Sequence, residues 1–191
     1  MSQIRHTEQS RDSLYEDLSS ALERVVALWH GGERQLRFAV PVLCALRLEA
    51  FVNVAGKVTI ADWDRKERSL KFLSKCEAIC SARKLTFDRT AEPNHTALRI
   101  FELRHELVHP KMVTGSVDEL ISEAEYERRN AALLGLEHPL RAELSPEKVD
   151  SLVAATQSFF ENWSKPWLGE NPEYWLRWGS TGGFSWPPNA G

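Results

Sequence analysis

The stretch RFAVPVLCALRLEAFVNVA, residues Arg37 to Ala55, decides the fold. Its residues are apolar on nearly every side of a helical wheel, so a helix formed here has no broad polar face to turn toward water. Pro41 stands near its beginning and Gly56 follows its end, where these two residue types favour helix boundaries. We therefore predict a helix over Arg37–Ala55 that lies in the middle of the molecule.

Two polar residues interrupt this apolar stretch. Glu49 and Asn53 are four residues apart, so they share one face of the predicted helix. Buried polar side chains are normally hydrogen-bonded. The spacing favours a buried hydrogen-bonded pair that holds neighbouring backbone over a catalytic pair.

Further helices flank the central one on both sides in the sequence. Apolar residues recur at helical spacing, or helix-start signals stand, in four ranges: Ser10–Trp29, Asp62–Arg83, Val117–Leu134 after the capping box of Ser116, and Pro146–Trp163 after Ser145. Leu85–His95 is rich in turn residues and is expected to connect two helices. These patterns predict an all-α protein built as an up-and-down helical bundle.

The chain is expected to form one domain with an appendage. Its 191 residues suffice for a single core. We assign residues 1–163 to one helical domain and residues 164–191 to an irregular tail, because that tail mixes tryptophans with Gly, Pro, Asn and Ser. Such a tail is expected to pack on the body through its aromatic rings, the alternative being exposed rings that stack on bases.

Composition indicates a soluble globular protein. Charged residues make up 27% and hydrophobic residues 42% of the chain. With no signal-like N-terminus and no long apolar run, we expect a cytoplasmic protein without a membrane partner. The three cysteines are too few for a disulfide scaffold and lack Cys-x-x-Cys spacing, so we expect reduced, buried thiols and no metal.

A basic stripe runs from Lys57 to Arg89, where nine Lys and Arg residues stand among five acids. Such a stripe suits a phosphate backbone, and it equally suits a solvated helix face. The RNA-binding candidates are Lys66, Arg68, Lys71 and Lys75, together with Lys111 further on.

The stretch LRIFELRHELVHPK, Leu98 to Lys111, carries the candidate chemistry and fits two patterns. His105-Glu106-x-x-His109 matches the zinc motif in which two histidines bind the metal and the glutamate acts as base. Zinc requires a third protein ligand, and the nearest acids lie on a separate predicted helix beyond Pro110. A zinc hydrolase therefore remains a distant alternative.

The second pattern is Arg104 with His109, an Arg-x4-His pair, with His105 between them. Histidine has an ordinary pKa near neutrality and moves protons, while arginine keeps its charge and holds phosphate with a planar fork. A long arginine side chain can bend over a helix end toward a histidine five residues later. This trio suits metal-independent RNA cleavage.

The stretch IFELRHELVHPK resembles the signature of the HEPN superfamily, which is an Arg, then a polar residue, then a His. Three further segments are similar in order and spacing to HEPN-like bacterial proteins: LRLEAFVN (Leu46–Asn53), DWDRKERSLKFL (Asp62–Leu73) and FDRTAEP (Phe87–Pro93). The resemblance covers roughly Phe38 to Lys111. It implies a helical bundle that frequently dimerises.

The resemblance also implies a role for each site residue. In active members the activity is endoribonuclease without a cofactor, in toxin-antitoxin, phage-defence or RNA-processing systems. Arg104 would then stabilise the scissile phosphate, His109 would be the general acid or base, and His105 would be the polar helper, although Asn is more frequent there. Glu49 and Asn53 would support the site. The implied partners are RNA or nucleotide, a second copy of the chain, and an antitoxin or other partner protein. The alternative is a non-catalytic HEPN-type module that binds nucleotide or another protein.

Overall fold

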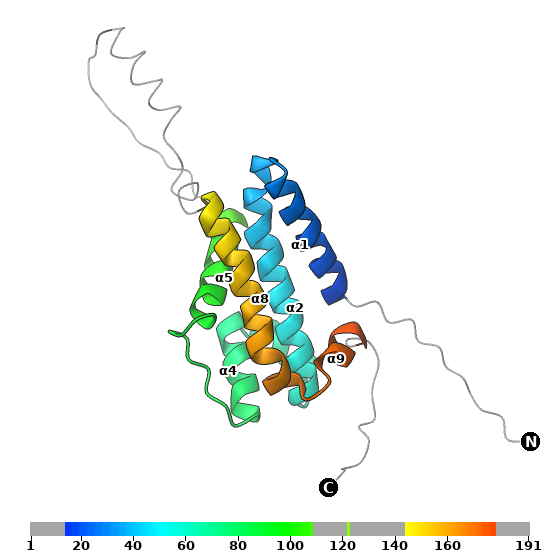
Figure 1. Cartoon of the computed structure of the whole chain (residues 1–191). Coiled ribbons are helices and arrows are strands. Elements are labelled where there is room, and N and C mark those ends of the chain that lie inside the picture. The colour runs from blue at the N-terminus through cyan, green and yellow to red at the C-terminus, as the bar shows by residue number, and fades with distance from the viewer. Residues whose placement is uncertain (1–13, 109–121, 123–143, 179–191) are drawn as a thin grey trace, which may run out of the picture.

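The computed structural model describes residues 14–108, 122 and 144–178, and every regular element among them is helical (Figure 1). The all-α prediction is confirmed for this part of the chain. The elements are α1 (Leu14–His30), η1 (Arg34–Phe38), α2 (Ala39–Thr59), α3 (Trp63–Lys66), η2 (Glu67–Ser69), α4 (Phe72–Ala82), α5 (Asn94–Val108), α8 (Pro146–Leu168) and α9 (Pro172–Trp178). The helix predicted over Val117–Leu134 lies outside the described residues, apart from Ser122.

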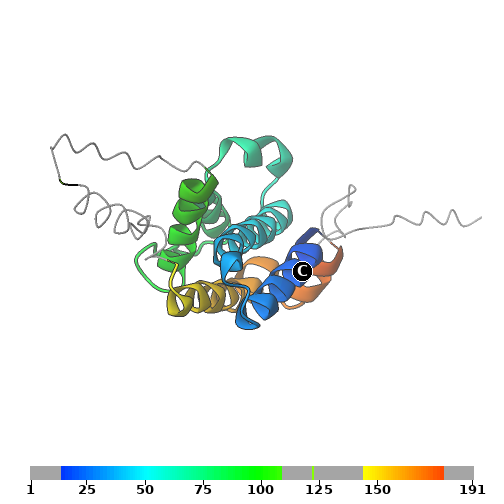
Figure 2. The same ribbon diagram turned by 90° about the horizontal axis from the view of Figure 1, so that it is seen from above.

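Helix α2 is the central element, as predicted. It packs against α1, α4, α5 and α8, which surround it in Figure 2. The expectation of no long apolar run is wrong, because the segment Gln35–Thr59 is long and apolar enough to cross a membrane by length and composition alone. Half of the most apolar part of this segment is buried inside the bundle. A helix that is apolar on most sides and packs against several neighbouring helices is typical of the core of a helical bundle.

The predicted end of α2 is wrong. The helix continues through Gly56 to Thr59, so this glycine does not end it. Gly56 instead provides space, because an ideal Cβ at this position would lie 2.1 Å from Cε2 of Trp63. Trp63 is 2% exposed and closes the lower end of α2.

The single helix predicted over Asp62–Arg83 is also wrong, because the structure divides it into α3, η2 and α4. Leu70 and Lys71 have extended backbone, with ψ angles of 133° and 160°, and they interrupt the helical hydrogen bonds. The interruption turns the chain between Trp63, which is anchored on α2, and Phe72, which is buried against α5 and α8. Two anchored aromatic residues therefore override a continuous helical pattern.

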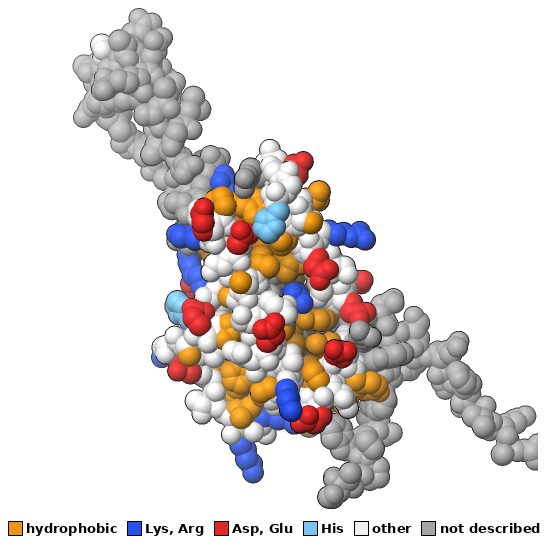
Figure 3. All heavy atoms as spheres, viewed as in Figure 1, with side chains coloured by type: hydrophobic (Ala, Val, Ile, Leu, Met, Phe, Trp, Pro, Cys, Tyr) orange, Lys and Arg blue, Asp and Glu red, His pale blue; other side chains and the backbone are white. Residues whose placement is uncertain are grey.

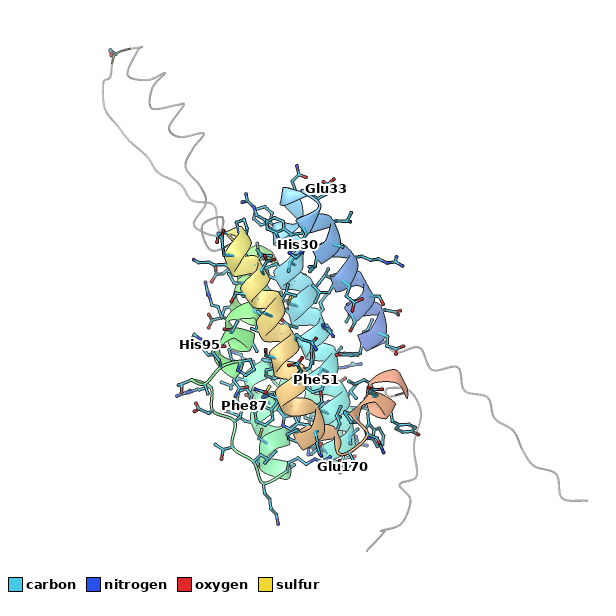
Figure 4. The ribbon with its side chains drawn as sticks, in the orientation of Figure 1. His30, Glu33, Phe51, Phe87, His95 and Glu170 are labelled. Carbon is cyan, nitrogen blue, oxygen red and sulfur yellow. The ribbon has the colours of Figure 1, made fainter. Side chains whose placement is uncertain are left out.

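Aromatic side chains fill the core between α2 and α8. Phe51 of α2, labelled in Figure 4, points into this core. Its ring centroid lies 6.2, 5.0 and 5.6 Å from those of Phe159, Phe160 and Trp167. Helix α8 begins at Pro146 as predicted, but it extends to Leu168, and α9 follows. The prediction of irregular structure is thus wrong over residues 164–168 and 172–178, whereas Trp167 packs on the body, fully buried, as expected.

The contacts of α8 give the directions of α4 and α5. Phe72 at the start of α4 lies beside Phe159, and Arg83 just past its end donates to the carbonyl oxygen of Trp167, so α4 runs parallel to α8. Asn94 at the start of α5 lies at Trp163, and the last turn of α5 lies beside the start of α8 in Figure 1. Helix α5 is therefore antiparallel to both, and its last turn lies at the upper end of the bundle.

Candidate functional site

Helix α5 positions the residues singled out for chemistry. Its start is held by Asn94, which donates from Nδ2 to the carbonyl oxygen of Asp88 at 2.8 Å and accepts from Nε1 of Trp163 at 2.8 Å. Asn94, Ala97, Ile100 and Leu103 form its buried face. This spacing of three residues fixes the rotation of the helix about its axis, and so decides which side chains reach solvent.

Arg104 immediately precedes the last turn of α5 and His105 begins that turn; both follow the buried Leu103. Arg104 is half-buried and His105 is exposed. His109 and Lys111 lie outside the described residues, so the structure describes only the arginine and the helper of the predicted trio. Helix α5 is described as far as Val108.

The two arginines of α5 differ in their partners. Arg99 Nη1 donates to Glu102 Oε2 at 2.9 Å and to Glu106 Oε1 at 3.3 Å. Among the described residues, no ion pair or hydrogen bond joins Arg104 to an acid. Arg104 therefore keeps its positive charge available to an anion, whereas the charge of Arg99 is neutralised on the helix itself.

The same pairing bears on the zinc interpretation. Glu106, the residue that would act as base on a zinc-bound water, accepts a hydrogen bond from Arg99. Within the described parts of the chain, no three His, Cys, Asp or Glu side chains are grouped as metal ligands. Because an ion pair holds the carboxylate of Glu106 against Arg99, a base role for it would require this pair to open.

Glu49 and Asn53 bind a lysine. Lys75 Nζ of α4 donates to Glu49 Oε1 at 3.1 Å and to Asn53 Oδ1 at 2.9 Å. The predicted bonds to neighbouring backbone are not what the described contacts show, because both side chains accept from the ammonium of Lys75 instead. No described contact links Glu49 or Asn53 to Arg104. Helices α4 and α5 are antiparallel, so Lys75 and Arg104 lie on opposite sides of the stacked rings of Phe72 and Phe101 along the bundle.

The prediction that Lys75 contacts RNA is wrong, because Lys75 is only 4% exposed and its charge is directed at α2. The helical spacing contained the signal: Lys75 stands three residues after the buried Phe72 and four before the buried Ile79, so it shares their face. Treating the basic residues as one stripe concealed this position.

The other basic candidates lie at the surface. Lys66, Arg68 and Lys71 are exposed on α3, η2 and the turn before α4. Elsewhere in the stripe, Lys57 pairs with Asp64 at 3.1 Å and Arg83 donates to the Trp167 carbonyl at 2.6 Å. The predicted stripe therefore divides into residues with structural partners and residues that face solvent.

The three cysteines are buried and free of disulfides, as expected. Burial raises the pKa of the Cys44 thiol from 9.0 to about 11 and raises the pKa of Cys76 well above its ordinary value. Burial also raises the pKa of Cys80. Thiols with raised pKa values stay protonated at neutral pH, which makes them poor nucleophiles and poor metal ligands.

The described part of the chain is thus an all-α helical bundle in which Arg104, near the end of α5, has no acidic partner among the described residues and the exposed His105 lies in the last turn. Comparison with family models, with curated proteins and with solved structures finds no match for this chain.

Proposed function

We propose that this chain is a metal-independent endoribonuclease of the HEPN type, acting in the cytoplasm as a homodimer in a toxin-antitoxin or phage-defence system. The site would consist of Arg104, His105 and His109 at the end of α5. The observation that carries the proposal is the difference between the two arginines of α5: Arg99 is neutralised by Glu102 and Glu106, and Arg104 has no acidic partner among the residues described.

The chemistry follows from the residue types. The 2′-hydroxyl of a ribose attacks the adjacent phosphorus and passes its proton to a histidine. The bond from phosphorus to the 5′ oxygen of the next nucleotide breaks, and that oxygen takes up a proton. The products are a 2′,3′-cyclic phosphate and a 5′-hydroxyl end. Arg104 would stabilise the negative charge that builds on the phosphate oxygens, and His109 would transfer protons, with His105 helping to orient the substrate.

A mixture of unstructured RNAs tests the proposal. We expect cleavage that persists in EDTA and leaves cyclic phosphate ends. Arg104→Ala and His109→Ala should each lower the rate by about a hundred-fold or more, because each removes transition-state stabilisation or proton transfer. Arg24→Ala, an exposed arginine of α1, is the matched control and should cleave at the wild-type rate. Cleavage that survives in Arg104→Ala, with all variants purified identically, would mean a contaminating nuclease.

A non-catalytic binding module is the second candidate. The charge of Arg104, which has no acidic partner among the described residues, favours anion binding whether or not a histidine moves a proton beside it. This candidate predicts nucleotide or RNA binding that Arg104→Ala weakens, with no product formed by the wild-type protein. Loss of cleavage in EDTA, with recovery in zinc and inactivity of Glu106→Ala, would instead identify the zinc hydrolase.

A further inference from the structure

Two basic segments that are distant in the sequence meet where α4 begins against α5. The rings of Phe72 and Phe101 stack there with centroids 3.9 Å apart and planes 19° from parallel. Lys71 immediately precedes Phe72, and Arg104 follows Phe101 by three residues, which is about one helical turn. The exposed Lys71 and the half-buried Arg104 therefore flank one aromatic contact.

Several acids of α2, α3 and α5 are neutralised by other cations. Their pairs are Lys75 with Glu49, Arg99 with Glu102 and Glu106, and Lys57 with Asp64. By contrast, none of the ion pairs found in the described ranges involves Arg68, Lys71 or Arg104. Among the described residues, Glu67 of η2 and the exposed Glu77 of α4 are in no ion pair, so the three cations outnumber these two acids and leave a local excess of positive charge.

We propose that Arg68, Lys71 and Arg104 form one phosphate-binding track, and that the substrate is consequently a single-stranded RNA of several nucleotides. The inference rests on the proposed function, because Arg104 belongs to both. A strand held by Arg104 would continue past the Phe72–Phe101 contact to Lys71 and then to Arg68, with one phosphate near each cation. Neutralising successive phosphates releases counterions, so affinity should rise with strand length and fall with salt.

A second face of the bundle supplies control positions. In Figure 3, the face formed by α1 and α8 carries acidic and basic side chains interspersed with hydrophobic ones. Arg24 of α1 and Lys148 of α8 are exposed cations on these helices. They supply a control in which the same net charge is removed from a place outside the track.

The experiment measures binding without cleavage. The probe is a fluorescein-labelled oligouridine of about twelve nucleotides with 2′-O-methyl riboses, which cannot attack the phosphate. Its affinity is measured from about 50 to 200 mM salt. We expect Arg68→Gln/Lys71→Gln to weaken binding by about ten-fold or more and to lower the slope of log affinity against log salt by about 1.4, or about 0.7 for each lost phosphate contact. Arg24→Gln/Lys148→Gln should leave both values unchanged.

Four results would overturn the track. They are wild-type binding and slope in Arg68→Gln/Lys71→Gln, equal weakening in Arg24→Gln/Lys148→Gln, equal affinity for a dinucleotide and the longer strand, and tighter binding of polyglutamate than of RNA. Circular dichroism checks that each variant is folded, which is expected because the substituted residues are exposed.

Failure of the track is distinguishable from failure of the proposed function. If Arg68→Gln/Lys71→Gln binds RNA like the wild type while Arg104→Ala abolishes cleavage, the track is wrong and the nuclease remains. If binding follows the prediction but the wild type produces no cyclic phosphate from unmodified RNA, the nuclease is wrong and the binding surface remains.

Discussion

The indole of Trp63 occupies the space where any other residue at position 56 would carry its side chain: an ideal Cβ on Gly56 lies 2.1 Å from Cε2 and 2.4 Å from Cδ2 of the ring. Trp63 is 2% exposed, so the ring has no open space into which it can move. Close contact between α2 and the turn that follows it thus depends on the absence of one methyl group.

Gly56→Ala should lower the free energy of unfolding by about 1–3 kcal/mol, since overpacking of a buried contact outweighs the better helix propensity of alanine. Urea denaturation measures the change. In Gly56→Ala/Trp63→Leu the clash is relieved, so the two effects should not add. Simple additivity, or an undiminished stability of Gly56→Ala, would contradict the close contact.

Glu49→Ala should destabilise the protein more than Lys75→Met does. Removing the carboxylate leaves the buried ammonium of Lys75 with Asn53 as its only described partner, while methionine removes the charge and keeps most of the apolar stem. We expect losses of about 2 kcal/mol and about 1 kcal/mol, since Glu49 is itself partly exposed. The reverse order in urea denaturation would mean that the ion pair does not stabilise the α2–α4 contact.

Asn94→Ala should lower the unfolding free energy by about 2 kcal/mol, because it removes two hydrogen bonds, one to the Asp88 carbonyl and one from Trp163. Trp163→Phe removes one of them and keeps an aromatic ring beside Phe87, so about half that loss is expected. Equal losses in thermal or urea melts would show that the indole matters only for packing.

Stability should fall as the pH rises from 9 toward 11. The pKa of Cys44 is raised by burial from 9.0 to about 11. Between pH 9 and pH 11 the unfolded chain therefore releases this proton while the folded chain keeps it, which favours the unfolded state. Below pH 9 both states keep the proton and the full contribution is present. Cys44→Ala should reduce this loss of stability by about 2 kcal/mol at pH 11. An unchanged pH dependence in that variant, measured by urea titration, would assign the effect to other groups.

The sequence alone was sufficient to predict the class of the fold and its centre. The apolar residues of α2, the periodicity of α1 and the Ser145–Pro146 start signal of α8 are local patterns, and local patterns determine where helices form. The boundaries at Gly56 and at Leu70–Lys71 depend on where Trp63 and Phe72 pack, which is decided by residues far away in the chain.

The candidate site could be predicted only in part, for the same reason. The candidate residues of α5 can be found in the sequence from their residue types. The side of α5 that faces solvent follows from the three-residue spacing of the buried Ala97, Ile100 and Leu103. The partners of charged residues are set by tertiary packing. The spacing from Phe72 and Ile79 places Lys75 on the buried face of α4, but its partners Glu49 and Asn53 are set by how α4 packs on α2.

The carbonyl oxygen of Trp167 accepts hydrogen bonds from Arg83 and from Thr59, residues 84 and 108 positions earlier. During synthesis, the lower ends of α2 and α4 leave the ribosome long before the residue that joins them. Closing loops of this length carries an entropic cost that short-range helical bundles avoid, so the slow step of folding should be the docking of α8. Until then the rings of Phe51 and Phe72 lack their α8 partners, which makes the nascent chain a substrate for chaperones.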